Sequence, residues 1–294
     1  MTAEQTRPEA GARAGASGDD ESGARAADKS SQGVVVAFGQ SMKTLRVRAG
    51  MEREELGKRL GYSASTIASF EQGRRIPPPR AIDRTDEELG ADGLLTVWKE
   101  QLERAQYPAF FQGMAQLEKQ AMELLAYDTM VVNGLLQTEE YMRGLLAMRR
   151  PPLDQETIEQ RVAARLARQD VLDRRPAPLL SFVMDESVLR HRYGGRQVIR
   201  GQLEHLLLLG ERRNVELQMM PTESEDNAGL NGPFTVVTRR DGKKFLYVEA
   251  ENTSTLSTDP EQTGLAAARY GIIRSQALTP RESLKFIEKL LGEL

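Results

Sequence analysis

The sequence predicts an α+β protein in which an all-α helix-turn-helix domain is followed by a mixed α/β domain. Between residues 34 and 90, apolar residues recur at three- and four-residue spacing with glycines at the breaks, which indicates short packed helices. After Pro178, short apolar segments alternate with amphipathic ones, which indicates a small sheet with helices. Residues 1–32 hold no large apolar side chain beyond Met1 and cannot form a core. We therefore expect a disordered tail over 1–32, the helix-turn-helix domain over 33–104 and the α+β domain over 105–294.

Composition excludes several classes of site. Cysteine is absent and histidine occurs only at His191 and His205, so disulfides, thiolate sites and multi-histidine metal sites are excluded. We expect neither a metal nor a cofactor. No apolar run approaches the roughly 20 residues that span a bilayer, and no signal pattern opens the chain, so we expect a cytoplasmic protein.

The charge of the chain is unevenly distributed. The net charge is −3, yet residues 34–85 hold ten basic and five acidic residues. A basic segment on an acidic chain indicates a polyanionic partner for that segment.

Five helices are expected in the first domain. Periodicity and breaks place them at about 34–49, at 53–60, within 61–75, from the three prolines at 77–79 to about 89, and over 92–98. Gly50 ends the first helix. Gly61 ends the second, at a point where the turn needs a positive φ.

The second and third helices have the spacing of a helix-turn-helix. Gly57 lets the two helices cross closely, and Ser63 is the expected N-cap of the third. Their mutual contacts are expected from Leu56, Leu60, Tyr62, Ile67 and Phe70. The third helix, in "GYSASTIASFEQGRR", otherwise carries small and hydroxyl side chains. A helix that mainly filled a core would carry more bulk, so we expect this one to enter a groove.

The segment "LRVRAGMEREELGKRLGYSASTIASFEQGRR" resembles the lambda-repressor-like, Xre-type family of DNA-binding regulators. The resemblance covers about residues 34–90 and implies binding to double-stranded DNA. It places a phosphate contact at Arg53 and a backbone contact at Arg74, which Arg75 can join. It also implies that Arg46 and Glu71 form a structural ion pair, so Arg46 is not counted among the DNA contacts. The positions facing bases or phosphates are Ser63, Ala64, Ser65, Thr66 and Ser69. Because serine and threonine discriminate bases less than bidentate side chains do, we expect shape, water and dimer spacing to supply much of the specificity.

The second domain is expected to hold helices first, then a small sheet, then two closing helices. The predicted helices lie at 113–127, 138–149, 155–172 and about 199–210, and the predicted strands are "PLLSFVM", "VELQMM" and the two arms of a hairpin in "FTVVTRRDGKKFLYVEA". Asp241-Gly242 is a strong turn signal. Asp259-Pro260 and Thr279-Pro280 each pair an N-cap with a first-turn proline, and Glu282 completes a capping box with Thr279.

This domain also resembles a known group. The segments "NGLLQTEEY", "MDESVLRHRYGG", "QLEHLLLL", "LQMMPT", "GPF" and "YVEAENTSTLSTDPE" are similar to the uncharacterised domain that follows Xre-type modules in many actinobacterial regulators. The resemblance implies a link to development or antibiotic production and pairing with a small acidic partner protein. Some members are described as antitoxin-like. Asn133 departs from the group, which usually has proline there. The resemblance supplies no chemistry, because none is established for the group.

Candidate effector or partner residues are Glu186, Arg190 and Glu249. They form either a polar pocket for an effector or ion pairs at a sheet edge. A basic stripe follows one helix at Arg161, Arg165 and Arg168, and we interpret it as a solvated face; the alternatives are docking of an acidic partner or contact with flanking DNA. No nucleophile or orienting group accompanies His191, so no catalytic residue is expected.

These observations predict a non-enzymatic transcriptional regulator, acting as a repressor at the nucleoid. It would bind DNA as a homodimer on half-sites about one helical turn (~34 Å) apart. Its C-terminal domain would dimerise and respond to a partner protein or small molecule. The alternative is an antitoxin-like protein that neutralises a small partner and autoregulates its operon.

Overall fold

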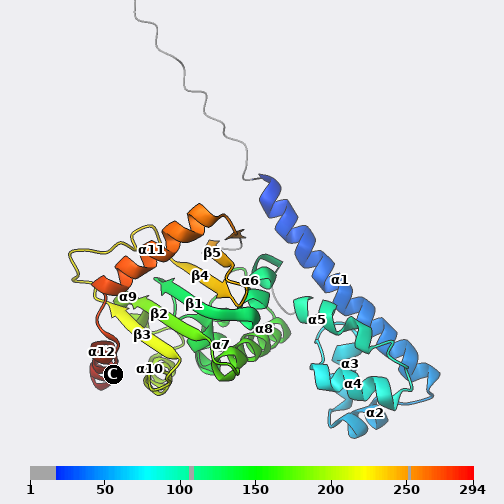
Figure 1. Cartoon of the computed structure of the whole chain (residues 1–294). Helices are drawn as coiled ribbons and strands as arrows, with labels where there is room; N and C mark the ends of the chain where they lie inside the picture. The colour runs from blue at the N-terminus through cyan, green and yellow to red at the C-terminus, as the bar shows by residue number, and fades with distance from the viewer. Residues whose placement is uncertain (1–17, 106–108, 251–252) are drawn as a thin grey trace, which may run out of the picture.

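The computed structural model describes residues 18–105, 109–250 and 253–294. A helical N-terminal domain is followed by a domain built on one sheet (Figure 1). Within the described residues, no helix combines the length and apolar character needed to cross a bilayer.

The N-terminal domain is entirely helical, as predicted. Its elements are α1 (Gly18–Arg48), α2 (Arg53–Leu60), α3 (Ala64–Glu71), α4 (Pro79–Glu88), η1 (Thr96–Trp98) and α5 (Lys99–Ala105). The second and third helices agree with the prediction. The helix predicted over 92–98 is wrong in type: the chain makes a single 3-10 turn there before α5, because Asp86 accepts hydrogen bonds from the backbone of Gly93, Leu95 and Thr96 and fixes a turn.

The core of this domain joins α1 to the helix-turn-helix. Phe38, Leu56, Ile67 and Phe70 are almost completely buried within one apolar cluster. Gly57 is required where α2 meets the turn, because a Cβ there would lie 2.5 Å from the carbonyl oxygen of Tyr62. Gly61 ends α2 in the left-handed conformation with φ 81°, as the sequence predicted.

The predicted tail differs from the structure in its extent. Residues 1–17 lie outside the described residues. From residue 18 onward the chain is helical, so α1 begins well before the expected start at Val34. Residues 18–32 thus belong to α1 in the structure, and the disorder expected for residues 1–32 stays a prediction. This segment continues a helix whose buried face lies downstream, at Val35, Phe38 and Met42.

The second domain contains a six-stranded mixed sheet in the order β3-β2-β1-β4-β5-β6. The strands are β1 (Ala121–Asp128), β2 (Leu179–Asp185), β3 (Val215–Met220), β4 (Phe234–Arg239), β5 (Lys244–Ala250) and β6 (Thr253–Ser257). β1, β2 and β3 are parallel, whereas β4, β5 and β6 form an antiparallel meander joined to β1.

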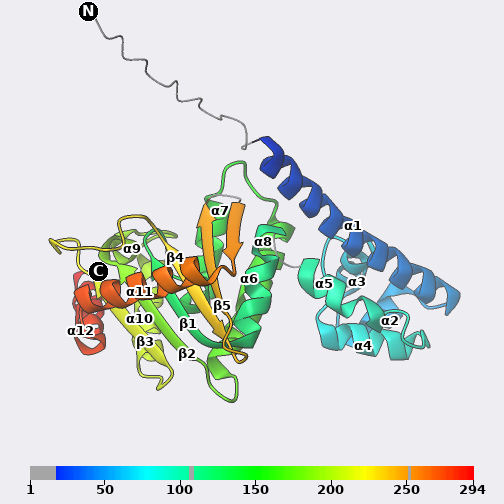
Figure 2. The ribbon, with the colours of Figure 1, turned by 45° about the horizontal axis from the view of Figure 1, so that its top comes forward.

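Helices cover both faces of this sheet (Figure 2). The helices are α6 (Ala109–Gln120), α7 (Glu139–Ala147), α8 (Gln155–Arg168), α9 (Glu186–Arg190), α10 (Arg196–Gly210), α11 (Pro260–Gln276) and α12 (Pro280–Glu293), with 3-10 turns η2 (Gly134–Leu136) and η3 (Gln169–Asp173). α11 packs on one face, where the Tyr270 hydroxyl lies 2.9 Å from Ser181 Oγ. α6, α10 and α12 contribute to the larger cluster on the other face.

One predicted element of the second domain is of the wrong type. The helix predicted over 113–127 ends at Gln120, and the following residues form β1 at the centre of the sheet. β1 is flanked by β2 and β4, and it contributes buried residues to the apolar clusters on both faces of the sheet, so its sequence "AMELLAYD" shows no alternation. A short apolar run of this kind does not distinguish a helix from a central strand. β6 and α9 were not predicted.

Several local signals agree with the structure. Gly242 lies at the β4–β5 turn with φ 78°. Asp259 caps α11 through the backbone nitrogen of Gln262, and Thr279 forms a complete capping box with Glu282 at the start of α12.

Candidate nucleic-acid interface and C-terminal pocket

The N-terminus of α3 presents small polar side chains to the surface. The Ser63 hydroxyl accepts a hydrogen bond from the Thr66 backbone nitrogen at 3.1 Å, which makes Ser63 the N-cap of the helix. Ser63, Ala64 and Ser65 are exposed, whereas Thr66 and Ser69 are half-buried. The apolar side of α3 faces the core through Ile67 and Phe70. The residues expected to face DNA bases or phosphates therefore lie together on one accessible face of the domain.

The buried carboxylate of Glu71 forms ion pairs with two arginines, Arg46 and Arg53, next to this face. Glu71 is buried, and its Oε1 lies 2.5 Å from Arg46 Nε, so the pair implied by the family resemblance is present. Arg53 Nε lies 2.7 Å from the other oxygen, Glu71 Oε2. The two arginine side chains differ in exposure, 7% for Arg46 and 37% for Arg53. Arg53 is therefore oriented by Glu71 while part of its guanidinium faces solvent.

The two arginines that follow α3, Arg74 and Arg75, are also exposed. Their backbone nitrogens donate to the Ser69 carbonyl oxygen, at 3.0 Å from Arg74 and 3.3 Å from Arg75, which folds this loop against the helix. Arg74 Nε lies 3.9 Å from Glu156 Oε2 in the first turn of α8, and so links the two domains. The Arg75 guanidinium lies 5.9 Å from the centre of the Phe70 ring.

The structure does not bring the three effector candidates together. Glu186 and Arg190 form an ion pair within α9, with Nε 2.5 Å from Oε1, and Glu186 Oε2 accepts from the Thr222 backbone nitrogen at 3.0 Å. Glu249 instead lines a separate cavity that Glu186 and Arg190 do not line. The Glu186–Arg190 pair agrees with the ion-pair alternative, and the effector role of the three residues stays a prediction. Glu186 and Arg190 are satisfied by each other because they lie one turn apart on one short helix.

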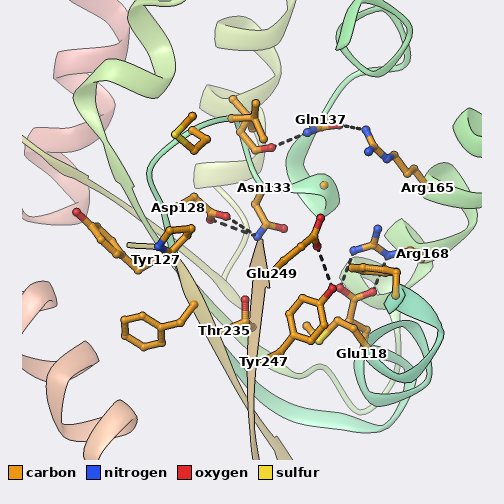
Figure 3. A pocket seen from close by; sticks show the side chains of 18 of the residues that line it. Glu118, Tyr127, Asp128, Asn133, Gln137, Arg165, Arg168, Thr235, Tyr247 and Glu249 are labelled. Atoms are coloured by element: carbon orange, nitrogen blue, oxygen red, sulfur yellow. Dashed lines mark hydrogen bonds and ion pairs between the residues drawn. The ribbon is translucent and has the colours of Figure 1, made fainter. Parts of the chain in front are cut away.

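That separate cavity, called here the β1 pocket, opens at the end of the central strand (Figure 3). It has a volume of about 370 Å³. Its walls come from α6, the end of β1, the segment leading into η2, α8, the start of β4 and the end of β5. Its charged side chains are Glu118, Asp128, Glu249, Arg149, Arg161, Arg165 and Arg168. The stripe on α8 thus lines a pocket, and its interpretation as a solvated face is wrong.

Two of the pocket arginines have different kinds of partner. Arg168 and Glu118 form a buried bidentate pair, with both nitrogen–oxygen distances at 2.7 Å. Arg165 donates from an η-nitrogen to Gln137 Oε1 at 3.1 Å, and Gln137 is held in turn by the Val132 carbonyl oxygen at 2.6 Å. Burial and the neighbouring guanidiniums lower the pKa of Arg165 to about 10, so it stays charged at neutral pH.

The other two acids of the pocket, Asp128 and Glu249, accept hydrogen bonds from neutral groups. Asn133 Nδ2 lies 3.2 Å from both carboxylate oxygens of Asp128. Burial raises the pKa of Asp128 to about 7 despite that hydrogen bond. Glu249 Oε2 accepts from the Tyr247 hydroxyl at 2.9 Å. Among the described residues, no group of three or more His, Cys, Asp or Glu is placed to hold a metal.

Comparison with known families matches two parts of the chain. Residues 111–289 match the family described as "Domain of unknown function (DUF5753)". The chain belongs to the DUF5753 family. Residues 37–97 match the family described as "Helix-turn-helix domain". The comparisons with curated proteins and with solved structures gave no significant match. The DUF5753 match contains every residue that lines the β1 pocket, whereas α2 and α3 lie in the helix-turn-helix match.

Sequence reasoning missed most of the pocket in the DUF5753 domain. Asp128 was assigned to a helix, so its place at the carboxyl end of a strand was hidden. Asn133 and Gln137 lie in the quoted segment "NGLLQT" but carried no assigned role. Arg161, Arg165 and Arg168 were noticed because four- and three-residue spacing puts them on one helix face. Their burial was not visible, because the strand that they face lies elsewhere in the chain.

Proposed function

We propose that this protein is a sequence-specific transcriptional regulator that binds double-stranded DNA through α3. The observation that carries the proposal is the open face of α3, where Ser63, Ala64 and Ser65 are exposed while the opposite side is locked into the core. Arg53, Arg74 and Arg75 flank this face as phosphate contacts, and Thr66 and Ser69 complete the reading surface. The family match to a helix-turn-helix domain supports this role.

We propose further that the protein acts as a dimer. α3 has only eight residues, and small hydroxyl side chains give weaker direct discrimination than arginine or glutamine. Two copies on half-sites about one helical turn apart double the contacts and add spacing as a criterion. A dimer of this kind works as a repressor when its site overlaps a promoter, and it does so at the nucleoid in the cytoplasm.

The C-terminal domain is proposed to control the DNA-binding domain. Support comes from α8, which contributes four residues to the lining of the β1 pocket and, at its first turn, places Glu156 next to Arg74. An effector or a small acidic partner protein that shifts α8 would change the position of Arg74 relative to DNA. Any such effect requires different affinities of the effector for two arrangements.

Genome-wide mapping of bound sites, compared with expression in a deletion strain, tests this function. We expect a small set of sites with a shared two-fold motif, and higher expression of adjacent genes in the deletion strain. Scattered binding without a motif would contradict sequence-specific regulation. If the protein instead suppresses the toxicity of a small co-expressed partner and binds only its own promoter, the antitoxin-like alternative is correct.

A further inference from the structure

We propose that the β1 pocket binds a small organic monocarboxylate, whose carboxylate is held by the Arg165 guanidinium. The regulatory consequence of this binding rests on the proposed function, in which the C-terminal domain controls DNA binding. The binding itself is a property of the pocket and is measured without DNA.

Arg165 is the first observation. It projects from α8 into the pocket, and in the part of the chain that the structure describes it forms no ion pair with a carboxylate. Its one hydrogen bond goes to the neutral amide of Gln137. Removing a guanidinium from water without pairing it with an anion costs free energy. A half-buried arginine without a carboxylate partner therefore indicates a binding site for an anion. The remaining N–H groups match the two oxygens of a carboxylate in a bidentate pair.

Arg165 is also held in position before any ligand arrives. Gln137 is buried, and its amide nitrogen donates to Val132 while its oxygen accepts from Arg165. Gln169 donates to the Gln137 carbonyl oxygen at 2.8 Å. Figure 3 shows Arg165 and Gln137 side by side at one end of the pocket. A fixed donor loses little conformational entropy on binding, which favours a small ligand.

The charge of the lining indicates an anionic ligand. The four lining arginines outnumber the lining carboxylates by one when Asp128 is ionised and by two when it is protonated, so the described lining is positive in both states. Arg168 is already neutralised by Glu118. A monocarboxylate is attracted by this positive charge through one bidentate contact with Arg165, whereas a phosphate monoester brings nearly two charges and would face Glu249. We therefore assign a carboxylate and not a phosphate.

The rest of the pocket indicates an apolar or aromatic body. Rings of Phe111, Tyr127, Phe234 and Tyr247 contribute to its walls, with Phe111 and Tyr247 in edge-to-face contact at 5.8 Å between centroids. The volume of about 370 Å³ lies in the range of small-molecule sites. The pocket also opens beyond the carboxyl end of β1, which is where sheets with parallel strands commonly bind ligands.

The test uses full-length protein and defined probes. Phenylacetate supplies a carboxylate on an aromatic body, phenylacetamide is its neutral counterpart, and inorganic phosphate tests a general anion site. Calorimetry and thermal unfolding are measured on the wild type, on Arg165→Met and on Arg200→Met. Arg200 is the matched control because it lies on α10, pairs with exposed Glu204 and does not line the pocket.

We expect phenylacetate to bind the wild type and Arg200→Met at millimolar concentration and to raise both melting temperatures. Binding should weaken by about tenfold or more in Arg165→Met, and by a similar factor when phenylacetamide replaces phenylacetate. Without ligand, Arg165→Met should melt at or above the wild-type temperature, because a desolvated charge has been removed. That result also shows that the variant is folded.

Three results would overturn the proposal: no probe binds the wild type, phenylacetamide binds as tightly as phenylacetate, or Arg165→Met retains full affinity. Phosphate binding in preference to phenylacetate would overturn the assignment of a carboxylate. The outcome is separate from that of the proposed function. Failure to bind DNA would refute regulation without changing the calorimetry, and Arg165→Met is expected to keep its DNA affinity in the absence of ligand.

Discussion

Glu71 illustrates how one buried carboxylate can serve both folding and DNA binding. Arg46 donates to both oxygens of Glu71 and Arg53 donates to one of them, but only Arg53 is partly exposed. Arg46 is committed to the interior and also donates to the Met51 carbonyl oxygen at 2.6 Å. We therefore propose Arg53 as the residue that contacts a DNA phosphate, already oriented by its pair with Glu71.

Replacement of Arg53 by alanine should weaken binding to all DNA sequences. One phosphate contact is lost, so the slope of log affinity against log salt should fall by about one unit. Stability should change little, because Glu71 keeps its pair with Arg46. Fluorescence anisotropy across a salt series measures this. Lys58→Ala, on the same helix and paired with exposed Glu54, is the control. A wild-type salt slope in Arg53→Ala would show that Arg53 does not contact phosphate.

Asp128 should make stability depend on pH. Its pKa is raised to about 7 in the folded protein from 3.8, so the folded state holds a proton that the unfolded state releases. Stability should therefore fall as pH rises from about 4 to about 7, by up to a few kcal/mol. Asp128→Asn should lack this component and be more stable than the wild type above pH 7. Urea unfolding at several pH values measures it, and identical pH profiles would contradict the assignment.

At the scale of elements, two helical glycines differ in how close the neighbouring backbone lies: Gly57 is crowded, whereas Gly264 is not. Gly57→Ala puts a Cβ 2.5 Å from the Tyr62 carbonyl oxygen, so α2 and the turn must separate. We expect a loss of about 1–3 kcal/mol and weaker DNA binding. Gly264→Ala is the matched control in α11, where nothing lies within 4 Å of the added Cβ. It should stabilise by up to about 1 kcal/mol. Thermal unfolding measures both, and equal effects would contradict the close crossing.

The elements that the sequence predicted are those with local signals. Gly61, Ser63 and the Thr279–Glu282 box mark helix ends through contacts within a few residues, and all three agree with the structure. β1 was misassigned because its apolar run is explained only by strands distant in sequence. The sequence does not predict the β1 pocket for the same reason, because Asp128 and Arg165 come to line one pocket only when the sheet has formed.

At the scale of the whole molecule, α8 touches both the pocket and the DNA-binding domain, as α6 also does through its contacts with α1 and α5. Glu156 lies 3.9 Å from Arg74, and both side chains are partly exposed. Such a pair contributes little to stability, about 0–1 kcal/mol, but it competes with phosphate for Arg74. We therefore propose Arg74 as the point at which the C-terminal domain acts on DNA affinity.

Glu156→Gln should raise DNA affinity by about twofold to fivefold at low salt and leave the melting temperature unchanged. The gain should vanish at high salt because the pair is exposed. Glu140→Gln, in the first turn of α7, is the control. Anisotropy with a bound fragment measures the effect, and unchanged affinity at low salt would show that this contact does not compete with DNA.

The most direct measurement is the affinity of Ala64→Glu for a DNA fragment recovered from the genome. Ala64 is exposed at the first position of α3, where a glutamate is compatible with the helix dipole, so the fold should be kept. If the open face of α3 meets DNA, phosphate repulsion should lower affinity by about tenfold or more while the melting temperature stays the same. Ala268→Glu makes the same charge change at an exposed position of α11, and this variant should bind DNA with wild-type affinity. Wild-type affinity in Ala64→Glu would contradict the account.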